Sequence, residues 1–255
     1  MNYSATPILK VRSVFKKFGA ITAARDLNIS VEAESITGLI GSNGAGKTTL
    51  LNMITGYLKP DSGNIIFHNQ EIAGKSPKNI TEHGIYRSFQ IPQVFDNMSV
   101  DENLRISVSI ALDKGAYKDD LEKTPEILVT ETLNQFQLLD CRKQIACNLP
   151  EGTRKLLDIA MALIMKPKLL LLDEPTSGVA AEEKFLIMDM VMSAIKSEKT
   201  TVMFVEHDME IVAKYTSRTI AFFNGEIIAD GKTEKVLRDS SVKKNILGND
   251  EQSKI

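Results

Sequence analysis

Apolar residues gather in short runs that alternate with longer amphipathic stretches along most of the chain. Nearly uninterrupted runs at residues 36–40, 169–172 and 201–205 predict buried strands. Shorter runs bounded by Gly, Asn or Ser predict further strands at residues 8–14, 27–31, 65–67, 219–223 and 226–228. Apolar positions at helical spacing predict helices at residues 124–139, 154–165 and 181–195, and another directly after residue 47.

This alternation predicts an α/β fold. Strands that alternate with helices form a mostly parallel sheet covered on both faces, and such sheets bind ligands at the carboxyl ends of their strands. The first three short runs predict a small antiparallel β subdomain near the N-terminus. From about residue 92 to residue 160 the sequence is charged and favours helices, so we expect a helical insertion there. We expect one domain over residues 1–248 and a flexible tail at 249–255.

The segment between the run at 36–40 and the next helix reads GSNGAGKTT and matches the phosphate-binding pattern G-x-x-x-x-G-K-[ST]. In such a loop, backbone N–H groups surround a polyphosphate and the helix N-terminus favours its charge. Lys47 would reach the β- and γ-phosphates of ATP, and the Thr48 hydroxyl would bind Mg²⁺. The predicted nucleotide-binding residues of this loop are Gly41, Ser42, Asn43, Gly44, Ala45, Gly46, Lys47, Thr48 and Thr49.

Further polar residues follow the predicted strands. Asp173 and Glu174 end the run at 169–172, and we expect Asp173 to bind Mg²⁺ and Glu174 to act as the general base on water. His207 follows the run at 201–205, at the edge where a γ-phosphate would lie. Gln90 offers an amide oxygen to the metal or to water. Asp173, Glu174 and His207 would each be ordinary alone, but their place after predicted strands favours a catalytic role. A loop glutamine by itself indicates no function.

Composition argues against several classes of protein. A net charge of −2 and a pI near 6.0 provide no basic footprint for nucleic acid. Cys141 and Cys147 are too few for a disulfide framework. No apolar stretch approaches eighteen residues and the first ten residues contain no apolar signal segment. We therefore expect a cytoplasmic chain that does not cross a membrane by itself.

The order of these motifs resembles that of the ATP-binding-cassette (ABC) family. The loop at 41–48, Gln90, the segment 149–153, the pair Asp173-Glu174 and His207 occur in the family's order. Within the family, segments 84–90, 94–95, 98–104 and 205–209 are most similar to the ATPases of branched-chain amino acid importers. Cassettes for urea, other amides or lipopolysaccharide look similar.

The resemblance implies a phosphate-loop NTPase core that hydrolyses ATP with Mg²⁺. It also implies a head-to-tail dimer with a second ABC ATPase subunit, identical or different. Each nucleotide would lie between one chain's phosphate loop and the other chain's Pro150, Glu151 and Gly152. Phe18 would stack on the adenine, and a core position like that of Phe15 is the alternative.

The resemblance further implies the partners of the chain. These are integral-membrane permease subunits at the inner face of the cell membrane and, indirectly, a periplasmic or extracellular solute-binding protein. Nucleic acid is not among them.

The segment 149–153 corresponds to the signature segment of the family. It reads LPEGT where the family has LSGGQ. Pro150 lacks the hydroxyl that contacts the partner's γ-phosphate, and a Glu151 carboxylate about 6 Å from a phosphate charge would cost about 3 kcal/mol before screening. We expect Arg154 to offset much of this repulsion. Alternatively, Pro150 and Glu151 serve to start a helix. Ala180 also stands where the family usually carries an aspartate.

We predict an ATPase that energises uptake of branched-chain or similar small amino acids or amides. One alternative is a nucleotide-binding partner subunit with a degenerate signature in a heterodimeric transporter. Another is an ABC ATPase for a different solute or lipid. A cassette that acts on DNA or ribosomes is disfavoured because the sequence has neither a long coiled coil nor a basic arm.

Overall fold

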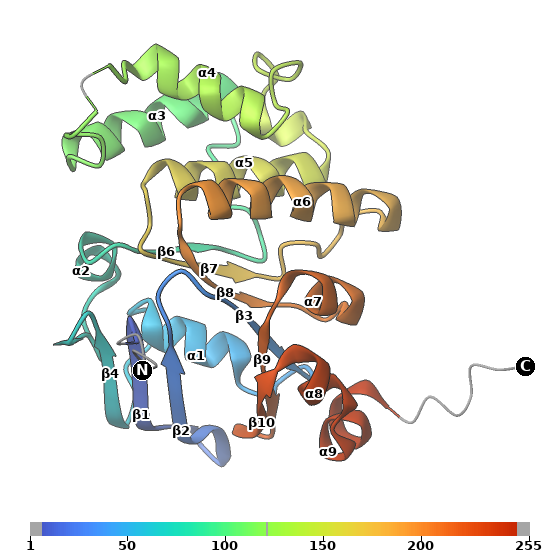
Figure 1. The fold of residues 1–255 in the computed structure, drawn as a ribbon. Helices are drawn as coiled ribbons and strands as arrows, with labels where there is room; N and C mark the ends of the chain where they lie inside the picture. The colour runs from blue at the N-terminus through green and yellow to red at the C-terminus, as the bar shows by residue number, and fades with distance from the viewer. Residues whose placement is uncertain (1–6, 121, 249–255) are drawn as a thin grey trace, which may run out of the picture. The chain divides into compact units, whose positions relative to one another are not determined.

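The computed structural model describes residues 7–120 and 122–248, and the tail predicted at 249–255 lies outside them. The chain divides into two compact units. Of the described residues, 7–83 and 201–248 belong to unit 1, and 84–120 and 122–200 belong to unit 2 (Figure 1).

Unit 1 contains the predicted antiparallel sheet. Its strand order is β2-β1-β4-β5. Leu9, Val11 and Val14 are all buried on β1. Residues an odd number of positions apart face opposite sides of a regular strand, yet Val11 and Val14 are both buried. Ser13 has a φ of 47°, and the register shifts between Val11 and Val14. This bulge returns Val14 to the buried face. The strands are β1 (Leu9–Phe18), β2 (Ile21–Val31), β4 (Ser62–Phe67) and β5 (Gln70–Glu71).

A second group of strands in unit 1 is mostly parallel. β3 (Ile36–Gly41) pairs in parallel with both β8 (Thr201–Val205) and β9 (Arg218–Phe223), and β10 (Glu226–Lys232) adds an antiparallel edge to β9. Leu39 lies opposite Val205 in this register. The carboxyl ends of β3 and β8 therefore meet at one edge. The helical segments of this unit are α1 (Lys47–Ile54), α2 (Pro77–Glu82), α7 (Met209–Tyr215), α8 (Thr233–Arg238), α9 (Ser240–Val242) and η2 (Lys243–Leu247).

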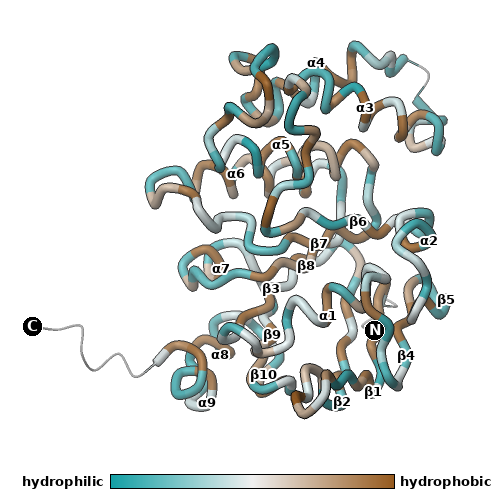
Figure 2. The backbone as a smooth tube through the Cα atoms, turned by 180° about the vertical axis from the view of Figure 1, so that it is seen from behind, coloured by the Kyte–Doolittle hydropathy of each residue, from teal (hydrophilic) through white to brown (hydrophobic). Residues whose placement is uncertain are grey.

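Unit 2 is built from helices and one pair of parallel strands. β6 (Ile85–Ser88) pairs with β7 (Leu169–Asp173), whose leucines are fully buried and brown in Figure 2. Because both faces of β7 are covered, its sequence is continuously apolar. The helices of this unit are α3 (Val100–Asp113), α4 (Pro125–Gln135), α5 (Glu151–Ile164) and α6 (Ala181–Ser197), with a short 3₁₀ turn η1 (Ala146–Asn148).

The helices α3, α4 and α5 occupy the region where a helical insertion is predicted. Ser99 and Glu102 form a reciprocal capping box at the start of α3, and Thr124 caps α4. The predicted α/β class, with an antiparallel sheet near the N-terminus and mostly parallel strands elsewhere, is confirmed. Within the described residues, no helix is long and apolar enough to span a bilayer.

Candidate functional site

The loop from β3 to α1 forms a cradle of backbone groups in unit 1. Gly44 and Gly46 have φ values of 79° and 108°, which side chains rarely allow. A Cβ on Gly46 would lie 2.3 Å from the carbonyl oxygen of Ala23, so this end of the loop packs directly on β2. A Cβ on Gly44 would meet no atom within 4 Å. The loop is thus fixed at Gly46 and has room for a phosphate group at Gly44.

Lys47 is the first residue of α1 and the cation of this cradle. Its side chain is buried, and its Nζ donates hydrogen bonds to the carbonyl oxygens of Gly41 at 2.6 Å and Ser42 at 3.0 Å. The ammonium group is therefore held along the loop. Gly46 has no side chain to cap the N–H groups at the start of α1, so these donors can serve an anion. Thr48 is exposed beside them.

His207 lies at the same edge of the sheet in unit 1, two residues after β8. Its side chain is exposed. The turn is held by Glu206, a buried residue whose Oε2 accepts the backbone N–H groups of His207 at 3.0 Å and Asp208 at 3.3 Å. Glu206 therefore fixes the backbone from which the imidazole projects. Sequence reasoning missed this role because a carboxylate beside a histidine carries no pattern of its own.

Phe18 ends β1 and is exposed, with 47% of its surface accessible. The ammonium of Lys16 lies 5.5 Å from the centre of its ring. The alternative of a core position for Phe18 is therefore wrong, and its ring is available for stacking.

In unit 2, Gln90 and Glu174 lie in direct contact. The Gln90 amide Nε2 donates to Oε2 of Glu174 at 2.7 Å. Glu174 follows β7 and has a φ of 52°, a left-handed conformation that is uncommon for a residue with a side chain. A tight turn thus aims the predicted base toward the glutamine.

Asp173 ends β7 and forms a buried ion pair. Its Oδ2 lies 2.5 Å from Nη2 of Arg87 on β6, and both side chains are only 5% exposed. Arg87 occupies one oxygen of the carboxylate that is predicted to bind Mg²⁺. Sequence reasoning did not assign a role to Arg87, because the pair forms only when β6 and β7 lie side by side.

Asp158 on α5 holds the glutamine loop, which is the segment that carries Gln90, against this helix. Its Oδ2 accepts the Ser88 hydroxyl at 2.6 Å, and its Oδ1 accepts the Gln93 N–H at 3.0 Å. Burial raises the pKa of the Asp158 carboxyl, although these hydrogen bonds and Lys155 act in the opposite direction. The loop that carries Gln90 is therefore anchored at both ends by one buried side chain.

The altered signature segment forms the start of α5. Pro150 is the N-cap residue and Glu151 is the first helical residue, as the helix-starting interpretation requires. A Cβ on Gly178 would lie 2.3 Å from Oε1 of Glu151, so the carboxylate fills the space beside this glycine. Gly152 is buried, and its Cβ position is 3.0 Å from Cδ1 of Ile187.

The expectation that Arg154 offsets the charge of Glu151 needs correction. The Arg154 guanidinium forms an ion pair with Asp96 in the segment before α3. The ion-pair partner of this arginine is therefore Asp96 and not Glu151.

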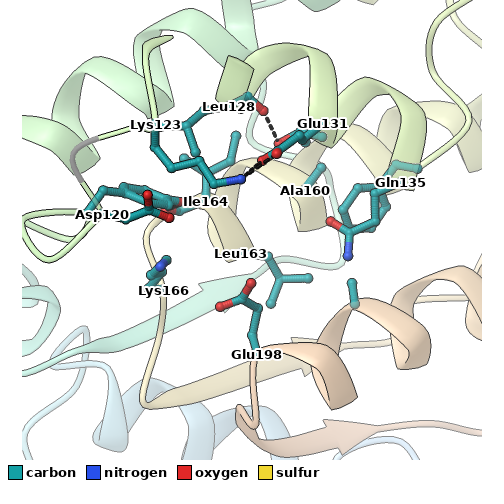
Figure 3. A pocket seen from close by; sticks show the side chains of 14 residues that line it. Asp120, Lys123, Leu128, Glu131, Gln135, Ala160, Leu163, Ile164, Lys166 and Glu198 are labelled. Carbon is teal, nitrogen blue, oxygen red and sulfur yellow. Dashed lines mark hydrogen bonds and ion pairs between the residues drawn. The ribbon is translucent and has the colours of Figure 1, made fainter. Parts of the chain in front are cut away.

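A cavity of about 180 Å³ lies elsewhere in unit 2, among α4, α5 and the end of α6 (Figure 3). Lys123 and Glu131 form an ion pair on its rim, and Glu198 lies across from them. Burial raises the pKa of Tyr117, which lines it, to about 12. None of the residues predicted for nucleotide chemistry lines this cavity.

The residues fit a magnesium ion only in company with a nucleotide. Across residues 7–120 and 122–248, no three His, Cys, Asp or Glu side chains converge to hold a metal. Mg²⁺ keeps several waters and takes its other oxygens from substrate phosphates and one or two protein groups. The hydroxyl of Thr48 in unit 1 and the second carboxylate oxygen of Asp173 in unit 2 are each a ligand of the kind that such sparse coordination uses.

Comparisons with known proteins agree with these features. Residues 24–177 match the ABC transporter family. The chain is 37% identical over 241 residues to a probable branched-chain amino acid transport ATP-binding protein LivG of Methanocaldococcus jannaschii, covering 91% of this chain and 92% of that protein. It is 31% identical to the high-affinity branched-chain amino acid transport ATP-binding protein LivG of Escherichia coli K12, and the match covers 95% of this chain and 98% of that protein. A solved structure of an ATP-binding cassette of an ABC transporter, in its ADP conformation, matches with a TM-score of 0.79 and 34% identity. The match covers 95% of this chain and 99% of that chain.

Proposed function

We propose, given that the chain belongs to the ABC transporter family as an ATP-binding cassette, that it energises an importer of branched-chain amino acids. The similarity over nine-tenths of the chain to two proteins named for this transport carries the proposal. The cassette is an ATPase, so the solute itself is moved by separate membrane subunits. In this role it works as a peripheral subunit at the inner face of the cell membrane.

The proposed reaction converts ATP and water to ADP and phosphate. Lys47 and the N–H groups at the start of α1 bind the phosphates, and Phe18 stacks on the adenine. Thr48 and Asp173 would hold Mg²⁺, which would supply positive charge to the transferring phosphate group. Arg87 holds one oxygen of the Asp173 carboxylate in a buried ion pair, which fixes the direction of the other oxygen.

Glu174 takes the proton from the attacking water. The contact from Gln90 holds the carboxylate of Glu174 in place and also marks where water or the metal would be received. His207, on the turn fixed by Glu206, donates a hydrogen bond to the γ-phosphate oxygens. Each of these groups acts by position and charge, as phosphoryl transfer requires.

The signature segment supports a second candidate, a partner subunit in a heterodimeric transporter. Pro150 offers no hydroxyl, and Asp96 holds the arginine that would otherwise balance Glu151. In a head-to-tail dimer this deficit would fall on the partner's nucleotide. The chain's own phosphate loop would then work best with an intact signature supplied by a different cassette.

Reconstitution tests the main proposal. The membrane proteins that co-purify with the chain are incorporated into vesicles with it, and uptake of labelled leucine is compared with uptake of urea and an acyl amide. We expect ATP-dependent leucine uptake that is lost in Glu174→Gln. Uptake of urea or amide alone would reassign the solute, and vesicles that take up none of these solutes on addition of ATP would contradict the importer function.

A further inference from the structure

One face of α5 carries buried charges that the proposed reaction does not use directly. Lys155 and Asp158 are three residues apart, so both point to the same side of the helix. Lys155 is 1% exposed and Asp158 is 6% exposed. Lysine is almost never fully buried without a polar partner, because its ammonium group loses hydration. A methylene-rich apolar residue would fill the same volume without this cost, so packing alone does not explain the charge.

The partner of Lys155 is the backbone of the predicted base. Its Nζ donates a hydrogen bond of 2.8 Å to the carbonyl oxygen of Glu174. Glu174 has the left-handed φ of 52° and is followed by Pro175. Such a conformation persists only when neighbouring groups hold it. The ammonium of Lys155 supplies a charge-assisted contact at the residue whose backbone needs it.

The Glu174 carboxylate is held from the other side by the glutamine loop. Gln90 donates to its Oε2, and the base of that loop is tied to Asp158. One helix therefore holds the backbone of Glu174 through Lys155 and the side-chain partner of Glu174 through Asp158. Four residues before Lys155, Glu151 of the altered signature occupies the same helix.

We propose that Lys155 is a positioning residue for ATP hydrolysis, which holds the backbone of Glu174 so that its carboxylate stays against Gln90. The inference rests on the proposed role of Glu174 as the base. Lys155 touches neither ATP nor water in this scheme. Its contribution is to the rate of the chemical step, and nucleotide affinity should not depend on it.

The test is a double-mutant cycle between Lys155→Met and Glu174→Gln, with the purified chain and MgATP. Methionine keeps the length and burial of the side chain and removes the donor. In the parent background we expect kcat to fall roughly 10- to 100-fold, as misplacement of a catalytic group by about an ångström does. The KM for MgATP should stay within about twofold. In the Glu174→Gln background, single-turnover hydrolysis should be unchanged by Lys155→Met, because the group that Lys155 positions is already gone.

Lys196→Met provides the matched control, since Lys196 is an exposed lysine in the last turn of α6. It should leave kcat and KM unchanged. Lys155→Arg retains a charged donor and should restore part of kcat. If Lys155→Met does not fold, the same cycle with Lys155→Leu, which is shorter and also lacks a donor, replaces it.

An equal fractional loss of kcat in both backgrounds would overturn the proposal, because Lys155 would then act independently of Glu174. A rise in KM with unchanged kcat would also overturn it. Failure of the underlying function is visible separately: Glu174→Gln alone would then hydrolyse ATP at the parent rate.

Discussion

At the scale of single residues, the candidate site depends on charged groups whose partners are backbone atoms. Lys47 is held by the carbonyl oxygens of Gly41 and Ser42, and Glu206 holds two backbone N–H groups beside His207. Such contacts fix the direction in which each group points as well as the position of its charge. They explain why similar residues elsewhere in the chain would not serve the same chemistry.

Lys47→Ala should weaken MgATP binding at least about tenfold. The change removes a charge-assisted contact worth about 1.5–3 kcal/mol. Isothermal titration calorimetry with the purified chain measures the effect. Lys78→Ala, which changes an exposed lysine on α2, is the control and should bind as the parent does. Equal affinities of the Lys47 variant and the parent would exclude the loop as the nucleotide site.

At the scale of elements, loops of unusual shape are held by the helices and strands beside them. The phosphate loop is held where Gly46 meets Ala23 of β2, and the glutamine loop is held where Asp158 of α5 meets Ser88 and Gln93. The stability of each loop should therefore respond to changes in a neighbouring element.

Gly46→Ala should destabilise the fold more than Gly44→Ala. Both positions have positive φ, but only at Gly46 would the new Cβ collide with backbone, at 2.3 Å from the Ala23 carbonyl oxygen. We expect the difference in unfolding free energy between the two variants to be about 1–3 kcal/mol. Urea denaturation followed by circular dichroism measures it. Equal midpoints for the two variants would show that the loop can move away from β2.

Asp158→Asn should change how stability depends on pH. Burial raises the pKa of Asp158 above the value of 3.8 for an exposed aspartate, so the folded state holds this proton more tightly than the unfolded state. The stabilisation is complete below pH 3.8 and is lost as the pH rises through the raised pKa. The unfolding free energy of the parent minus that of the variant should therefore fall with increasing pH, by at most about 1.4 kcal/mol per pH unit. Denaturant unfolding at several pH values measures this difference, and an increase with pH would contradict the assignment.

At the scale of the whole molecule, the predicted site residues are divided between the two compact units. The phosphate loop, Phe18 and His207 belong to unit 1, and Gln90, Asp173 and Glu174 belong to unit 2 together with the signature segment. The proposed hydrolysis draws on both units and, through the signature, on a second cassette. Under this proposal, activity depends on an assembly of two cassettes.

The paired change Pro150→Ser and Glu151→Gly should raise ATP hydrolysis by the chain alone. It returns a hydroxyl donor and removes a like charge near the partner's γ-phosphate. Hydrolysis under saturating MgATP should increase about tenfold, and stimulation of the parent by a cassette with an intact signature should be lost in the variant. Glu182→Gln, which removes an exposed charge on α6, should change neither rate. A doubly restored chain that is no faster would exclude the heterodimer interpretation.

The sequence by itself determined the family and most of the elements of this protein. The glycine-rich pattern at 41–48 and the leucine run before Asp173 can be recognised because their function needs neighbouring residues in a fixed order. The strands β3, β7 and β8 follow from the same local pattern, since a buried parallel strand must be continuously apolar. By contrast, β6 was not predicted, because its four residues IYRS show no apolar run and form a strand only by pairing with β7.

Only the tertiary structure decided which side chains hold the predicted site residues. Arg87 meets Asp173 across 86 positions of sequence, Asp158 meets Ser88 across 70, and Lys155 meets the Glu174 carbonyl across 19. A local pattern cannot encode such pairs, because their proximity arises from strand pairing and helix packing. The same cause corrected the role of Arg154, whose charge was expected beside Glu151 and lies beside Asp96. Residue type thus fixed what these groups can do, and the fold selected the partner that each one has.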